Sequence, residues 1–247
     1  MWPVRPEFVP DPALSRDEME TLQHDIAAAA NFSDDSEDDS QRPTPEEAPI
    51  VAGVDQAFDD ETATSALVIM QSGEVIERVH ATEPTEIPYI PGLLSFREGG
   101  AILSAFKELE TEPDVVLVDG SGRIHFREAG LATHIGVTLD IPTVGVAKSL
   151  LCGQPRRSLS EPLPEGTRVA IEADGDVTAP EGTVIGHAVQ TRQYNSDSRY
   201  INPLYVSPGH QVSAETAADI VESQSSEYKL PEPTRLADSY AGELTRR

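Results

Sequence analysis

The pattern of apolar and polar residues predicts a strand-rich body that begins near residue 50. Three short apolar runs joined by polar stretches are typical of an antiparallel meander. The next two runs are apolar with little alternation, as expected for strands that are buried on both faces. A last pair follows nearer the carboxyl end. In chain order the runs are IVAGVD, SALVIM, EVIERVHA, DVVLVDG, PTVGVA, RVAIEA and TVIGHAV.

Helical periodicity separates and follows these strands. Helices are predicted from about Leu93 to Glu110, around Ala129 to Thr138, over AETAADIVES, and from Thr234 to Leu244. Strands that alternate with helices imply crossover connections and a sheet covered by helices on its faces. We therefore predict an α/β fold with a mixed sheet, in which three antiparallel strands are followed by parallel ones.

The first 49 residues have a different composition. They contain thirteen acidic residues and three arginines, with a predicted helix over residues 14–30 and then the run NFSDDSEDDSQRPTPEEAP, which is typical of a solvated flexible linker. We divide the chain into an acidic N-terminal extension, residues 1–49, and a single domain, residues 50–247. Such a domain is large enough for one sizeable core.

The charge balance is strongly acidic. There are 43 Asp and Glu against 18 Lys and Arg, a net charge of -25, and only Lys107, Lys148 and Lys229 are lysines. The acids are spread along the chain, which favours a halophilic surface over a docking site for basic partners. In molar salt the Debye length is about 3 Å, so repulsion between surface carboxylates is screened. Residues 120–160 reverse the trend with five basic and two acidic residues, and a polyanion would bind there.

Several classes of protein are excluded. No apolar run reaches the roughly 18 residues that a membrane helix needs, and MWPVRPEFVPDP lacks the apolar core of a signal peptide. The single cysteine, Cys152, excludes an internal disulfide framework and a multi-cysteine metal site. We expect a cytoplasmic protein that does not bind membranes.

Three carboxylates are candidates for one site. Asp55 ends the first strand and Asp119 the fourth, and ligands of α/β sheets gather outside the carboxyl ends of strands. Glu98 lies in the apolar stripe of the helix between them, so its side chain points inward. Converging carboxylates repel one another, and a hard divalent cation such as Mg²⁺ removes that penalty. The alternative is that each aspartate caps a turn or lies in solvent.

A proline-bounded turn precedes that helix. Pro88 and Pro91 hold Tyr89 in a stiff, extended segment. The turn either connects two elements or presents the tyrosine ring to a ligand.

The motifs VAGVD, PYIPGLLSFRE, VDGSGRIH, VGVAKSLLCG, NPLYVSPGH and LPEPTRLAD, in unbroken order from about Ile50 to Tyr240, resemble the endonuclease V family. The resemblance implies a ribonuclease H-like fold. It also implies a Mg²⁺-dependent endonuclease, with Mn²⁺ as a substitute, that recognises deoxyinosine in DNA or inosine in RNA. Such an enzyme cuts the second phosphodiester bond on the 3′ side of the lesion and leaves 3′-hydroxyl and 5′-phosphate ends. With the acidic composition, it indicates a halophilic archaeon as the source.

The resemblance also assigns roles to residues. Asp55, Glu98 and Asp119 would bind the metal, Lys148 would stabilise the phosphate, His210 would orient water or handle a proton, and Asp238 is a further candidate ligand. Tyr89 would wedge into the base stack. The lesion and its strand would be contacted by Tyr89, Pro91, Gly92, Leu94, Gly120, Gly122, His125 and Gly130.

Three positions depart from the family pattern: Ser121, Phe126 and Glu128. They leave the carboxylates untouched but lie next to the expected path of the strand. Two alternatives therefore stay open beside a DNA-directed nuclease that acts as a monomer. One is an inosine-specific endoribonuclease, and the other is a nucleic-acid-binding module of the same fold without catalytic activity.

Overall fold

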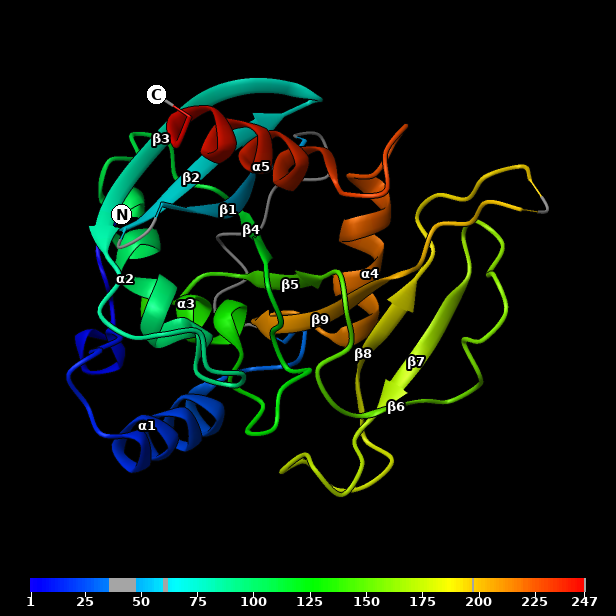
Figure 1. Cartoon of the computed structure of the whole chain (residues 1–247), viewed down its shortest axis with the longest axis horizontal. Coiled ribbons are helices and arrows are strands. Elements are labelled where there is room, and N and C mark those ends of the chain that lie inside the picture. Colours follow the sequence, from blue (N-terminus) through cyan, green and yellow to red (C-terminus); the bar gives the residue numbers. More distant parts are fainter. Residues whose placement is uncertain (36–47, 60–61, 197, 247) are drawn as a thin grey trace.

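The computed structural model describes residues 1–35, 48–59, 62–196 and 198–246. Its centre is a nine-stranded sheet in the order β3-β2-β1-β4-β5-β9-β8-β7-β6 (Figure 1). The strands are β1 (Val51–Asp59), β2 (Thr62–Gln71), β3 (Glu74–Pro84), β4 (Val115–Asp119), β5 (Thr143–Ala147), β6 (Gln154–Pro155), β7 (Arg168–Glu172), β8 (Val184–Val189) and β9 (Leu204–His210).

The pairing confirms the predicted mixed sheet. β1, β2 and β3 form an antiparallel meander, while β4 and β5 continue the sheet parallel to β1. β9 then runs antiparallel to β5, and β8 and β7 complete the far side. β9 was not expected from the sequence, because NPLYVSPGH contains a proline and a glycine that are uncommon inside strands.

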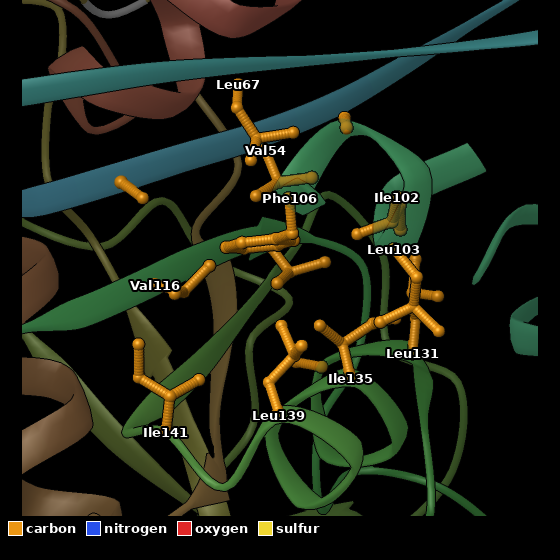
Figure 2. Packing of buried hydrophobic residues seen from close by; sticks show 14 of the residues in the cluster. Val54, Leu67, Ile102, Leu103, Phe106, Val116, Leu131, Ile135, Leu139 and Ile141 are labelled. Carbon is orange, nitrogen blue, oxygen red and sulfur yellow. The ribbon is translucent and has the colours of Figure 1, made fainter. Parts of the chain in front are cut away.

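Helices cover both faces of the sheet, as the prediction requires. They are α2 (Leu94–Lys107), α3 (Leu131–Leu139), α4 (Ala214–Ser223) and α5 (Glu232–Leu244). Alternate residues of β4 supply the two cores: Val116 and Val118 belong to the cluster with α2 and α3, whereas Val115 and Leu117 belong to the cluster with α4. Figure 2 shows side chains of the first core, including Phe106 and Ile135, gathered around Val116 and Val54.

Helix α5 lies directly against β1 because residue 53 has no side chain. A β-carbon on Gly53 would lie 2.1 Å from the carbonyl carbon of Pro233, well inside contact distance. This close approach brings the exposed Asp238 of α5 within hydrogen-bonding reach of Asp55 of β1. The glycine of the VAGVD motif therefore positions an acidic side chain.

The N-terminal segment packs on this body over residues 1–35. It contains η1 (Pro6–Phe8) and α1 (Arg16–Ala29), which lies within the predicted helix and begins with a capping box between Ser15 and Glu18. Ile26 of α1 is fully buried. Most of the predicted linker lies outside the described residues, and the division of the chain at residue 50 stays a prediction. Among the described helices, none has the length and apolar character to cross a membrane.

Candidate active site

Asp119 at the end of β4, Asp55 within β1 and Asp238 of α5 come together at one edge of the sheet. The prediction that Asp55 ends its strand is wrong, because β1 continues to Asp59; Asp55 instead follows Val54, the last residue of β1 that pairs with β4. Asp55 is buried, and burial is the main cause that raises its pKa well above the usual range. The charge of Asp119 and hydrogen bonds with Asp238 and Asp119 raise it further. Burial and the neighbouring carboxyl groups therefore favour the protonated form of Asp55.

Glu98 adds a fourth carboxyl to this edge, as the helical pattern predicts. It is 6% exposed, and burial raises its pKa to about 8. Arg97 opposes this rise, while the negative charge of Asp119 adds to it. The influence of Asp119 places Glu98 within electrostatic reach of the aspartates.

Lys148 lies at the same edge, and Lys229 lies within electrostatic reach of Lys148. The Lys148 Nζ donates to the Asp119 Oδ2 at 2.6 Å. Burial alone would lower the pKa of Lys148, but Asp119, Asp55 and Asp238 together raise it. The pKa of Lys229 is lowered by burial and by the positive charge of Lys148. The sequence did not single out Lys229, because nothing in the residues around it indicates that it approaches Lys148.

The residue types at this edge suit a hard divalent cation. They offer only carboxylate oxygens, which are the ligands that Mg²⁺ prefers. No group of three or more His, Cys, Asp or Glu side chains in the described ranges is already arranged to hold a metal ion. The Lys148 ammonium instead compensates the charge of Asp119. Asp55, Asp119, Glu98 and Asp238 would hold a divalent cation, for which their carboxyl groups would have to be deprotonated.

A cavity of about 150 Å³ opens beside the carboxylates. The predicted residues that line it are Tyr89, Pro91, Gly92, Leu94, Gly120, His125 and Gly130. Gly122, which was also predicted to contact the strand, does not line the cavity. A β-carbon on Gly122 would lie 2.3 Å from the Pro208 carbonyl oxygen, so the absence of a side chain lets this loop pack on β9. Ala147 and Ser149, which flank Lys148, also line the cavity, and so does Gln23 of α1.

Comparison with known proteins identifies the family. The Endonuclease V family model matches residues 34–239. An Endonuclease V of Haloarcula marismortui is 68% identical, over 98% of this chain and 96% of that protein.

This chain belongs to the Endonuclease V family.

Solved structures agree. The Endonuclease V of Streptomyces avermitilis has a TM-score of 0.78 at 28% identity, covering 98% of this chain and 96% of the other. The catalytic domain of human Endonuclease V has a TM-score of 0.76 at 30% identity, covering 93% of this chain and 95% of the other. The predicted family and its mixed α/β fold are thus confirmed, and the chain is a nuclease of the Endonuclease V type.

The structure does not bring His210 to the carboxylates of this edge. It pairs with Thr143 at the start of β5, whereas Asp119 pairs with Val146 near the end of that strand. Three residues of strand correspond to about 10 Å. His210 is buried and contacts Asp140 Oδ1 at 3.1 Å, and its Nδ1 accepts from the Asn31 backbone N–H at 3.1 Å. The structure therefore places His210 away from the carboxylates and brings Asp238 to Asp55 instead. The catalytic role of His210 stays a prediction.

His125 lines the cavity, but both of its ring nitrogens are already bonded within the protein. Its Nδ1 accepts from the Arg127 backbone N–H at 3.1 Å, which leaves Nε2 to donate to the Gly92 carbonyl oxygen at 3.0 Å. Burial lowers its pKa to about 4, so the ring is neutral. His125 therefore braces the cavity wall and has no free polar atom for a nucleic-acid strand.

The basic stretch is largely neutralised by ion pairs. Arg123 pairs at 2.8 Å with Glu128, and Glu128 is one of the residues that depart from the family pattern. Arg127 pairs with Glu20 at 2.6 Å, and Arg156 pairs with Glu172 at 2.6 Å. The positive surface that the sequence predicted is therefore weaker than its residue count indicates.

Replacement of Glu98 by Gln is expected to stabilise the metal-free protein in a pH-dependent way. A carboxyl whose pKa rises on folding favours the folded state below its unfolded value, about 4.3, and that benefit is lost as the pH rises through about 8. The amide does not titrate. The free energy of unfolding of Glu98→Gln should thus exceed that of the wild type at pH 8 by at least about 1 kcal/mol, which is roughly 2–4 °C in Tm. Near pH 4.5 the two proteins should be equally stable. Thermal unfolding in EDTA at both pH values checks this, and an equal gap at both would contradict it.

Substitutions of Asp238 and His210 should change different properties: the first should lower kcat, and the second should lower stability. Asp238→Asn removes a carboxylate from the active edge and is expected to lower kcat by about 100-fold or more, with Tm little changed. His210→Gln disrupts buried hydrogen bonds far from that edge, so it should cost about 1–3 kcal/mol of stability and leave kcat near the wild-type value. Nuclease rates and Tm of both variants decide the matter. A folded His210→Gln protein without activity would return His210 to the catalytic set.

Proposed function

We propose that this protein is a DNA repair endonuclease that uses Mg²⁺, with Mn²⁺ as a substitute, and acts on deoxyinosine, the product of adenine deamination. It hydrolyses the second phosphodiester bond on the 3′ side of the lesion and leaves 3′-hydroxyl and 5′-phosphate ends. The substrate and the position of the cut rest on membership of the Endonuclease V family together with the geometry of the active edge.

One observation carries this proposal: the same chain segments supply both the cavity and the carboxylates. Gly120 lines the cavity and directly follows Asp119. Ser95 lines it one helical turn before Glu98, and Ala147 and Ser149 line it on either side of Lys148. A base held in the cavity would therefore have its backbone next to the groups that suit phosphodiester hydrolysis.

Asp55, Asp119, Glu98 and Asp238 would hold the metal. A divalent ion supplies a Lewis acid for the phosphoryl oxygens and lowers the pKa of a bound water. Lys148, which already faces three carboxylates, is placed to move onto a non-bridging phosphate oxygen when a cation takes over its role at Asp119. Lys229 lies close enough to Lys148 to add positive charge for the neighbouring phosphate.

The cavity suits a base that has left the stack. Extrusion costs least where pairing is weak, as it is for hypoxanthine. The buried Ser95 hydroxyl has no hydrogen-bond partner among the described residues, a cost that a polar ligand nearby would reduce. Tyr89 is 65% exposed at the rim of the cavity, where it would wedge into the gap that the base leaves.

High salt favours recognition through the cavity. Contacts with phosphates weaken as counterions accumulate, and most arginines of the basic stretch are already paired with carboxylates. Stacking and close packing of a base are not screened in this way. We infer that discrimination in molar salt depends on the cavity and on Tyr89.

An Endonuclease V of Ciona intestinalis, 24% identical to this chain, has been crystallised with DNA that contains an inosine followed by a ribo-adenosine. For this chain we propose deoxyinosine in DNA as the substrate, and an inosine-containing RNA of the same sequence is the alternative that the test below compares.

The test is cleavage of end-labelled strands of identical sequence, with one deoxyinosine in DNA or one inosine in RNA, in molar KCl with Mg²⁺. We expect a nick one nucleotide beyond the lesion on DNA, no product in EDTA, and much slower cutting of undamaged DNA. Faster cutting of the RNA would favour the endoribonuclease. Equal cutting of damaged and undamaged DNA, or no cutting at all, would contradict the proposal.

Tyr89→Ala in the same assay tests the wedge. It should reduce the preference for deoxyinosine without a change in Tm, since the ring is exposed. An unchanged preference would leave the proline-bounded turn as a connector.

A further inference from the structure

One wall of the cavity depends on a side chain outside the residues that define the family. Gln23 belongs to α1, whereas the family match begins at residue 34. Gln23 is nonetheless 1% exposed and lines the cavity. A buried polar side chain so placed needs partners, because an unsatisfied amide costs about 1–3 kcal/mol.

All the partners of Gln23 belong to the walls of the cavity. Its Nε2 donates to the Gly92 carbonyl oxygen at 2.8 Å and to the Ala129 carbonyl oxygen at 3.4 Å. Gly92 ends the proline-bounded turn, and Ala129 belongs to the loop that follows β4. One amide therefore joins two segments that are far apart in sequence and both line the cavity.

The orientation of this amide is fixed from its other end. Arg127 Nη1 donates to the Gln23 Oε1 at 3.1 Å, so the amide nitrogen faces the two carbonyl groups. Nη2 of Arg127 pairs with Glu20 at 2.6 Å, and Glu20 lies one turn before Gln23 on the same face of α1. The Gly92 carbonyl oxygen also accepts from His125, so two donors hold it in place.

From this geometry we propose that Gln23 is a positioning residue that sets the width of the lesion cavity and so contributes to the choice of base. This rests on the proposed function. Without the amide, Gly92 keeps only its bond from His125, and nothing else among the described side chains joins the Gly92 and Ala129 carbonyl groups. The proline-bounded turn is then free to move outward, the extruded base loses close contact, and bases of other shapes are excluded less well.

Gln23→Met tests this in the full-length protein, because methionine has nearly the same length but no donor. With the deoxyinosine strand we expect KM to rise about 10-fold, the equivalent of one or two lost hydrogen bonds, and kcat at saturation to stay within about 2-fold. The preference for deoxyinosine over undamaged DNA should fall by a similar factor.

Gln23→Glu separates the loss of the hydrogen-bond donor from a change in side-chain packing. Its carboxylate still accepts from Arg127 but cannot donate to Gly92, so we expect the same rise in KM. His24→Gln is the matched control, because His24 is the exposed neighbour on α1 and should leave KM, kcat and Tm unchanged.

The outcomes distinguish the two proposals. If the wild type does not cut the deoxyinosine strand, the proposed function and the role of Gln23 both fall. If the wild type cuts but both Gln23 variants keep its KM and base preference, only the role of Gln23 is overturned. A fall in kcat with unchanged KM, or a Gln23→Glu protein that behaves as the wild type, would also overturn it. If Gln23→Met does not fold, Gln23→Glu alone decides.

Discussion

The burial of Asp55 and Glu98 beside Asp119 is the interaction on which the rest of the active edge depends. Carboxylates removed from water and placed near one another cannot all be charged unless a cation compensates them. This constraint raises the pKa values of Asp55 and Glu98, and the Lys148 ammonium pairs with Asp119. The edge is thus organised for a cation before one binds.

This constraint is demanding in a chain with a net charge of -25. Arginines that would otherwise attract nucleic acid are used in ion pairs that fix loops around the cavity, such as Arg123 with Glu128 and Arg127 with Glu20. Lys148, one of the three lysines, is paired with a carboxylate of the active edge. The basic stretch therefore offers little unpaired positive charge for the long-range attraction of a polyanion.

The fold and the first three carboxylates could be predicted because their signals are local. The end of β4 at Asp119 and the inward face at Glu98 follow from periodicity within a few residues, whereas β1 continues past Asp55 to Asp59. The positions of His210 and Asp238 relative to these carboxylates could not be predicted from local patterns. Which end of β9 lies near Asp119 depends on pairing with β5, and the approach of α5 to β1 depends on the missing side chain at Gly53. Gln23 gave no signal, because its partners are backbone carbonyl groups distant in sequence.

The most direct test of this account is the number of protons released when Mg²⁺ binds, measured by calorimetry at pH 7.5 in two buffers with different ionisation enthalpies. Since metal ligands must be deprotonated, the raised pKa values of Asp55 and Glu98 predict a net release of protons. The release should decrease toward high pH as both groups ionise on their own. Binding of Mg²⁺ at pH 7.5 without any release of protons would contradict the account.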